Sequence, residues 1–216
     1  EATVAKLMQK EAIAASTHRR FRICTTDSNH RLPVAENTVN REFFRDRPNE
    51  VWVSDLTYIP TKAGWLYLVV IIDLHSRKVV GWSMNTEMTT DVFLAALEMA
   101  LGRRGDVSGL IHHSDRGSQY CSHAFQSALR RNGIDCSMSR KGNCWDNAVA
   151  ESFFQLLKRE RIKKRIYLTR EIAKQDIFNY IKMIYTSVRR HTANNLLSPR
   201  EFERRFESET GACLVN

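Results

Sequence analysis

Three β-like segments follow one another from Val51 onward, and they constrain the fold more than any other feature of this chain. They read VWVSDLTYI, WLYLVVIID and KVVGWSM, are rich in β-branched and aromatic residues, and are joined by short polar turns. Apolar residues occupy both faces of the first two segments, which is typical of a sheet that is covered on both sides. We therefore expect an antiparallel meander of three strands, buried between layers of helices.

Helices and strands alternate after the meander. Apolar spacing predicts a helix from Thr90 to Gly102, a second from about Ser122 to Asn132 and a third from about Asn147 to Lys164. Short strands, LIHH and IDCSM, precede the second and third helices. This order predicts a mixed α/β fold in which a five-stranded sheet is flanked by helices.

The patterning divides the chain into three expected parts. We interpret them as a helical remnant with a polar linker, a central α/β core, and a helical appendage, at residues 1–48, 49–165 and 166–216. In the appendage we expect a long amphipathic helix after Thr169. A last helix is expected to begin at Ser198 and Pro199, because Ser is a helix cap and Pro suits the first helical turn. The chain starts at Glu1 within a helix-like stretch, so we also expect a preceding amino-terminal DNA-binding region.

The charge balance points to a polyanionic partner. The chain carries 33 Lys and Arg against 24 Asp and Glu, for a net charge of +9, which favours nucleic acid. Its hydrophobic share of 43% excludes a disordered chain. Five scattered cysteines form no CxxC pair, and no apolar run approaches the ~20 residues that span a bilayer. We expect a cytoplasmic protein that has no membrane contact.

Three acidic residues occupy places where core building alone does not put them. Asp55 interrupts an otherwise apolar strand, in which Asp is depleted. Asp115 directly follows a strand in HSDRGSQY, and Glu151 lies in the helix NAVAESFFQLLKRE. Taken singly, each acid also fits a structural role: a strand-end cap, a turn former and a solvated helix residue.

Helical geometry gives Glu151 a predicted orientation. At about 100° per residue, Val149, Phe153 and Leu156 form the expected buried stripe, and Glu151 lies about 180° from its centre. Lys158, seven residues later, lies about 20° from Glu151. The helix is therefore expected to present an acid and a base on one face.

Converging carboxylates would need a counterion. Two unit charges about 4 Å apart repel by roughly 4 kcal/mol at an effective dielectric constant near 20. Three carboxylates in one site therefore require cations or protons, and hard oxygen ligands of this kind suit Mg²⁺ or Mn²⁺.

Four segments resemble the D-D-E transposase and integrase superfamily, and most closely its bacterial insertion-sequence-three family. The matching segments are VWVSDLTYI around Asp55, HSDRGSQY around Asp115, SRKGNCWDNAVAESFF around Glu151 and the tail YIKMIYTSVRRHTANNLLSPREFE. Asp115 and Glu151 are separated by 35 residues, which is the spacing of that family, and Lys158 matches its basic position. The resemblance covers roughly residues 20 to 206.

The resemblance implies an RNase H-like transposase that uses two metal ions. Asp55 would bridge both ions, Asp115 would hold one and Glu151 the other. Water would attack the transposon ends to cleave them, and the freed 3′-hydroxyl would attack target DNA to join the strands. The implied partners are both DNAs, further copies of this chain, and a first-frame helix-turn-helix protein or fused region.

Several basic and polar residues are candidate DNA contacts. Lys158 would hold a phosphate or a terminal base beside the metals. Asn147 lies near Glu151 on the helical wheel and either contacts DNA or serves the helix start. Basic residues of the run KRERIKKR and of the tail are predicted to contact the DNA backbone: Arg159, Arg161, Lys163, Lys164, Arg189 and Arg190.

Other conspicuous residues are assigned structural roles. Asp73, in DLHSRK, is a rival acid but is better explained as closing a hairpin turn. His112 and His113 either pack in the core or support Asp115. The tryptophans are interpreted as core or loop anchors rather than base-stacking platforms: Trp52, Trp65 and Trp145.

Three function classes remain open on the sequence. The favoured one is a metal-dependent transposase catalytic domain. The alternatives are a DNA-binding or assembly module without catalysis, against which the intact acid triad argues, and an RNase H-like nuclease that does not join strands, against which Lys158 and the tail argue.

Overall fold

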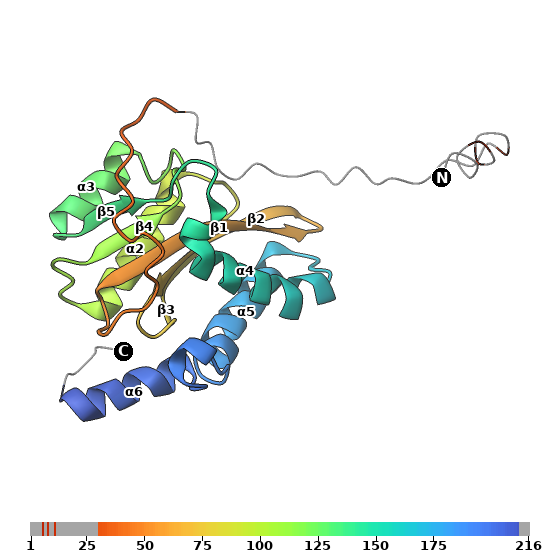
Figure 1. Ribbon diagram of the computed structural model, residues 1–216. Helices are drawn as coiled ribbons and strands as arrows, with labels where there is room; N and C mark the ends of the chain where they lie inside the picture. Colours follow the sequence, from red (N-terminus) through yellow and green to blue (C-terminus); the bar gives the residue numbers. More distant parts are fainter. Residues whose placement is uncertain (1–5, 7, 9–10, 12–29, 212–216) are drawn as a thin grey trace.

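Five strands form one mixed sheet in the order β3-β2-β1-β4-β5 (Figure 1). This computed structural model describes residues 30–211 together with Lys6, Met8 and Glu11. The predicted five-stranded α/β fold is confirmed. The strands are β1 (Val51–Thr61), β2 (Gly64–Asp73), β3 (Val79–Asn85), β4 (Ile111–Ser114) and β5 (Asp135–Met138).

The first three strands form the antiparallel meander that their sequence predicts. β1 pairs with β2, with Asp55 opposite Val70, and β2 pairs with β3. On its other side β1 pairs in parallel with β4, which pairs in parallel with β5. β1 is therefore the central strand of the sheet, and Asp55 lies in its interior.

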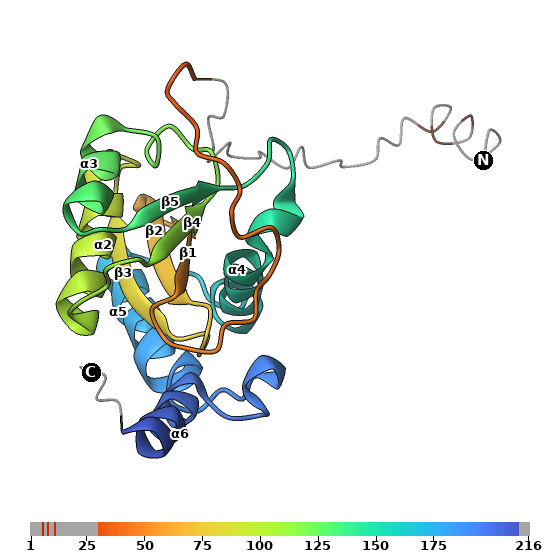
Figure 2. The same cartoon turned by 60° about the vertical axis from the view of Figure 1, so that its left-hand side comes forward.

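Helices cover both faces of the sheet (Figure 2). α2 (Thr90–Arg104) and α3 (His123–Arg131) pack on one face with Trp52 and Leu56 of β1. α4 (Ala148–Glu160) and α5 (Arg170–Asn179) pack on the other with Val53 and Ile59. Since side chains alternate along a strand, Asp55 projects to the same face as Val53, toward α4.

The buried stripe of α4 differs from the predicted one. Its buried members are Ala150, Phe153, Phe154 and Leu157, whereas Val149 and Leu156 are only partly buried. At about 100° per residue, Glu151 therefore lies about 100° from the centre of the stripe rather than opposite it. The apolar residues of this helix extend over much of its circumference, and the sheet packs against the two phenylalanines. Glu151 and Lys158 consequently lie at the border of the buried face, beside the sheet.

The end of α4 and the long helix of the appendage also differ from the prediction. α4 stops at Glu160, and a 3-10 turn, η2 (Ile162–Lys164), follows where one continuous helix was expected. The long helix expected after Thr169 is α5 followed by a π-helix, η3 (Tyr180–Tyr185), in which Thr186 N donates to Ile181 O at 3.0 Å. Three residues of this π-helix are buried in the core cluster: Tyr180, Ile181 and Tyr185.

The last helix, α6 (Pro199–Thr210), begins as predicted, with Ser198 accepting a hydrogen bond from Glu201 N. A buried ionic cluster attaches it to the core. Glu203, 3% exposed, pairs with Arg104 of α2, and its Oε2 is 2.7 Å from Lys78 Nζ. Arg104 also lies 3.7 Å from Asp73 at the end of β2. Buried charges of this kind are tolerated when each is paired.

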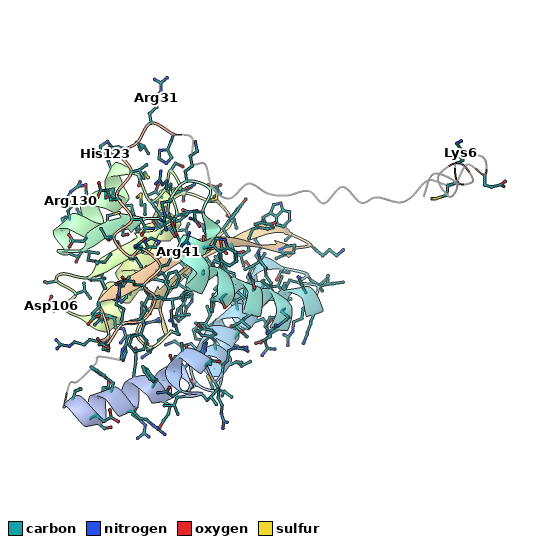
Figure 3. The ribbon with its side chains drawn as sticks, in the orientation of Figure 1. Lys6, Arg31, Arg41, Asp106, His123 and Arg130 are labelled. Carbon is teal, nitrogen blue, oxygen red and sulfur yellow. The ribbon has the colours of Figure 1, made fainter. Side chains whose placement is uncertain are left out.

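The amino-terminal segment reaches the core through polar contacts. Arg41, labelled in Figure 3, donates from Nε to Asp146 Oδ1 at 2.8 Å, and Val39 is fully buried. The helix expected within residues 1–48 falls outside the described residues, apart from Lys6, Met8 and Glu11. In the part of the chain that the structure describes, no helix combines the length and the apolar character needed to cross a membrane.

Candidate active site

Asp55 introduces a carboxylate into the central strand. It is half-buried, and its Oδ1 accepts a hydrogen bond from Leu56 N at 2.8 Å. The neighbouring β1 residues Val51, Val53 and Ile59, on the same face, are buried in the core that contains α4. Asp55 is therefore a polar side chain on an apolar face, held on a rigid strand.

The helix α4 brings two of the predicted residues to Asp55. Asp55, Glu151 and Lys158 line one cavity of about 370 Å³. Lys158 Nζ also lies 5.1 Å from the centre of the Tyr58 ring, which is a cation–π contact. The prediction that an acid and a base share one face of this helix is confirmed. The remaining lining residues are Leu56, Thr57, Tyr58, Phe154 and Gln155.

Asp115 directly follows β4, as predicted, but its carboxylate turns into its own loop. Asp115 Oδ1 accepts a hydrogen bond from Gly117 N at 2.9 Å. A Cβ added at Gly117 would lie 3.1 Å from that oxygen, so glycine keeps this tight turn open. Asp115 is not among the residues that line the cavity of Asp55 and Glu151.

The three acids still interact electrostatically. Burial raises the pKa of Asp55 well above its usual range, and the charges of Asp115 and Glu151 raise it further, while the Leu56 amide and Lys158 oppose the shift. Burial also raises the pKa of Glu151 and lowers the pKa of Lys158. The centre therefore carries negative charge that favours a proton or a cation at Asp55.

The donor chemistry of these acids fits a hard divalent cation. Carboxylate oxygens are the ligands that Mg²⁺ and Mn²⁺ prefer. Within the described residues, however, no group of three or more His, Cys, Asp and Glu side chains is arranged to hold a metal ion. Asp55 and Glu151 share a cavity, and the hydrogen bond to Gly117 engages one oxygen of Asp115.

Asn147 has a different position from the predicted DNA contact. Its side chain is 4% exposed, and its Nδ2 donates to the carbonyl oxygen of Ser54 at 3.0 Å. It makes no side-chain cap on α4 either. Asn147 instead joins the start of α4 to the residue that precedes Asp55, which fixes the helix against the strand.

The basic candidates fall into two groups. Arg189 pairs with Glu160, and Arg161 lies 4.0 Å from Asp176, so these two guanidinium groups connect α4 and the appendage. Their contacts with DNA stay predictions. The other four are exposed at or after the end of α4 or in the tail: Arg159, Lys163, Lys164 and Arg190.

The rival residues take structural positions. Asp73 is fully buried and accepts from Asn49 N and His75 N at 2.9 Å, so it closes the turn after β2 as predicted. His112 is fully buried between the rings of Tyr120 and Phe125.

His113 contacts the hydroxyls of Ser137 and Ser139 at 2.9 and 3.2 Å. Among the tryptophans, Trp52 is buried and Trp145 is 69% exposed.

Two lining residues were missed in the sequence. Gln155 lies between Glu151 and Lys158 on the cavity face, and its spacing of four residues from Glu151 was a usable signal. Tyr58, three residues after Asp55 on β1, has its ring against Lys158 and edge-on to Trp65 at 5.2 Å between centroids. No local pattern distinguishes Tyr58 from an ordinary strand aromatic.

The family comparisons agree with this geometry. A family model described as Integrase core domain matches residues 45–144, and a second model with that description matches residues 151–206. The first range contains Asp55 and Asp115, and the second contains Glu151 and Lys158.

Curated relatives match nearly the whole chain. Transposase InsF for insertion sequence IS3A of Escherichia coli (strain K12) is 45% identical over 201 residues, which cover 93% of this chain and 69% of that protein. An uncharacterized 31 kDa protein of insertion element IS600 from Shigella sonnei is 42% identical over 203 residues, covering 94% of this chain and 74% of that protein.

Solved structures share the fold at low identity. A chain of the simian T-cell lymphotropic virus intasome in complex with PP2A regulatory subunit B56 gamma has a TM-score of 0.61 at 18% identity, covering 93% of this chain and 69% of that chain. The HTLV-2 integrase catalytic core domain in complex with magnesium (trimeric form) has a TM-score of 0.55 at 17% identity, covering 72% of this chain and 96% of that chain. Together, the curated relatives, the family models and the shared fold show that this chain belongs to the IS3 family of transposases, within the retroviral integrase superfamily that has an RNase H-like core.

Proposed function

We propose that Asp55, Asp115 and Glu151 are the catalytic carboxylates with which this chain carries out the DNA transposition of its family. One observation carries the assignment: Asp55 and Glu151 line the same cavity as Lys158. Asp115 is included because its charge, after burial, is the next cause of the raised pKa of Asp55. A strand, a turn and a helix that are distant in sequence thus contribute to one electrostatic centre. Among the residues that the structure describes, no other carboxylate lines this cavity.

The same residues would hold divalent metal. Asp55, Asp115 and Glu151 would be the ligands of two Mg²⁺ or Mn²⁺ ions, which when bound activate the attacking oxygen and stabilise the leaving one. The HTLV-2 integrase core that shares this fold is described in complex with magnesium. A carboxylate has two oxygens, so Asp115 would ligate metal while its Oδ1 keeps the hydrogen bond from Gly117 N. Cation binding would also oppose the burial and the carboxylate repulsion that raise the pKa of Asp55.

The protein groups around the acids would position the DNA. Lys158 would bind a phosphate oxygen or the terminal base of the transposon end, next to the Tyr58 ring. Attack by water on the end phosphate would release a 3′-hydroxyl. Attack by that hydroxyl on a target phosphate would then join the strands, with no covalent enzyme intermediate.

Assembly on DNA belongs to the same proposal. Transposition must bring transposon ends and target together, so we propose that further copies of this chain bind the DNA with it, along with a first-frame helix-turn-helix protein or a fused region. The fold neighbours support an assembly, since one is from an intasome and another is a trimeric form.

An assay with end-labelled transposon DNA and Mn²⁺ tests the proposal. Joined products are expected from the parent chain, and Asp55→Asn should abolish both cleavage and joining. The exposed Glu98→Gln on α2, on the opposite face of the sheet, is the matched control and should remain active. Binding without cleavage by the parent would instead indicate an assembly module, and cleavage without joining a nuclease.

Metal binding gives a second readout that does not depend on turnover. Mn²⁺ titration followed by electron paramagnetic resonance should show loss of bound ion in Asp55→Asn and no change in Glu98→Gln. Equal Mn²⁺ binding by the parent and Asp55→Asn would contradict the assignment of Asp55.

A further inference from the structure

A second cavity lies at the β3 edge of the sheet. It is distinct from the cavity lined by Asp55 and Glu151, which we call the acidic centre. It has a volume of about 370 Å³ and is bounded by β3, the last turn of α2, the π-helix η3 and the start of α6. Since β2 separates β3 from β1 and neighbouring strands are about 4.8 Å apart, this cavity is about 10 Å or more from Asp55. The core and the appendage together form its walls.

The charged residues that line this second cavity are all basic. In the described part of the chain, no Asp or Glu lines it, whereas five basic residues do: Lys78, Arg103, Arg104, Lys182 and Arg200. Glu203 pairs with Lys78 and Arg104 but is not itself a lining residue of the cavity. Within residues 30–211, no carboxylate forms an ion pair with Arg103, Lys182 or Arg200.

Local contacts hold two of these cations in place. Arg103 donates to Val80 O at 3.1 Å, and its guanidinium lies 4.2 Å from the centre of the Trp82 ring. Lys182 Nζ lies 5.5 Å from the same ring. Trp82 is 4% exposed, so it is a rigid support for both cations. Their positions are thereby fixed before any ligand binds, which lowers the entropic cost of binding.

Mutual repulsion shows that these charges are crowded. Burial lowers the pKa of Lys182, and the charges of Arg103, Lys78 and Arg200 lower it further. An anion in the cavity would relieve this repulsion. The π-helix that presents Lys182 is a rare form that occurs frequently at functional sites. Thr186 and Ser187, which follow it directly, also line the cavity.

We propose that this second cavity binds a backbone phosphate of DNA, at a position outside the acidic centre. This inference rests on the proposed function, which requires the protein to hold transposon end and target DNA together. Guanidinium, ammonium and hydroxyl donors are the groups that bind phosphate oxygens without reading sequence. The volume leaves room for a phosphodiester and bridging water, since one water takes about 30 Å³.

Salt-dependent binding of a short random-sequence duplex, measured by fluorescence anisotropy in EDTA, tests the inference. The variant is Lys182→Gln with Arg200→Gln, because neither side chain is in the buried ionic cluster and Arg200 is exposed. Each phosphate contact contributes about 0.9 to the slope of log K against log salt concentration. We expect the slope to fall by about 1 and the affinity to fall several-fold.

Two controls define the outcome. Arg130→Gln with Arg131→Gln removes the same charge from α3, away from α6, and should change the slope much less (Figure 3). Lys182→Arg with Arg200→Lys keeps the charge and should bind like the parent.

An unchanged slope in Lys182→Gln/Arg200→Gln, or an equal loss in the α3 control, would overturn the cavity proposal. Failure of the parent chain to bind DNA at all would instead overturn the proposed function. If Lys182→Gln/Arg200→Gln does not fold, by circular dichroism, the exposed Arg200→Gln alone decides, and it should show a smaller fall in slope.

Discussion

The side chain of Asn147 donates a hydrogen bond of 3.0 Å to the carbonyl oxygen of Ser54, so the residue before α4 is joined to the residue before Asp55. Asp55 is on a strand and Glu151 is on a helix, and their separation depends on how that helix sits on the sheet. This contact is enclosed, with Ser54 1% and Asn147 4% exposed.

Replacing Asn147 should therefore disturb both stability and geometry. Asn147→Asp removes the donor and places a carboxylate against the Ser54 carbonyl, so we expect a larger loss of unfolding free energy than for Asn147→Ala, which should lose about 1–2 kcal/mol. The role in positioning predicts a lower rate of joining in Asn147→Ala at temperatures well below its unfolding midpoint. Thermal unfolding and single-turnover joining measure the two effects, and a parental joining rate would leave Asn147 a purely structural residue.

Glu151→Gln should remove joining while DNA binding persists. The amide keeps the size of the side chain but loses the charge, and loss of several kcal/mol of transition-state stabilisation corresponds to at least about a 100-fold lower rate. Joined product per unit time is the measurement, with duplex binding in EDTA as the companion. Continued joining by this variant would exclude Glu151 from the mechanism.

Lys158→Ala should weaken binding of transposon ends more than binding of random DNA. A charged hydrogen bond contributes about 1.5–3 kcal/mol, so about a tenfold loss on end sequences is expected. Lys164→Ala, on the exposed turn after α4, is the comparison and should weaken both DNAs equally. If Lys158→Ala also affects both DNAs equally, Lys158 is a general phosphate contact.

His112 should make the fold sensitive to acid. Burial lowers the pKa of His112 from 6.5 to about 3, with the charge of His113 adding to the shift. The unfolded chain therefore binds a proton that the folded chain does not, and stability present above pH 6.5 is lost as the pH falls toward 3.

Between pH 7 and 5 this loss amounts to about 2 kcal/mol. His112→Phe, between Tyr120 and Phe125, should reduce the loss, as measured by denaturant unfolding at both pH values. Identical pH dependence in the parent and the variant would contradict this assignment.

The sequence predicts the sheet better than it predicts the surfaces of its helices. The strands of the meander were found because β-branched residues on both faces have few alternative conformations. The predicted buried stripe of α4 was wrong because several of its apolar residues could face the core, and packing against the sheet determines which of them do: Val149, Phe153, Phe154 and Leu156. The π-helix after α5 was missed because its hydrogen bonds follow from tertiary packing and not from local residue preference.

The site was predicted unevenly for the same reason. Asp55, Glu151 and Lys158 were found because a charged residue in an apolar element is conspicuous, and they do meet in one cavity. Asn147 was misjudged because its partner, Ser54, is set by a tertiary contact. The ion pairs of Arg161 and Arg189 also follow from tertiary contacts, and their contacts with DNA stay predictions. The convergence of Asp115 with the other two acids remains a prediction.

The pairing of Arg104 with Glu203 has a consequence for synthesis on the ribosome. The two residues are 99 positions apart, so Arg104 leaves the ribosome well before Glu203. Until then the carboxylate beside this guanidinium is that of Asp73, at 3.7 Å, and the direct pairing with Glu203 that offsets the cost of burying it is missing. Final closure of the core should therefore coincide with the emergence of the last helix, and a ribosome stalled before Glu203 should display a protease-sensitive chain.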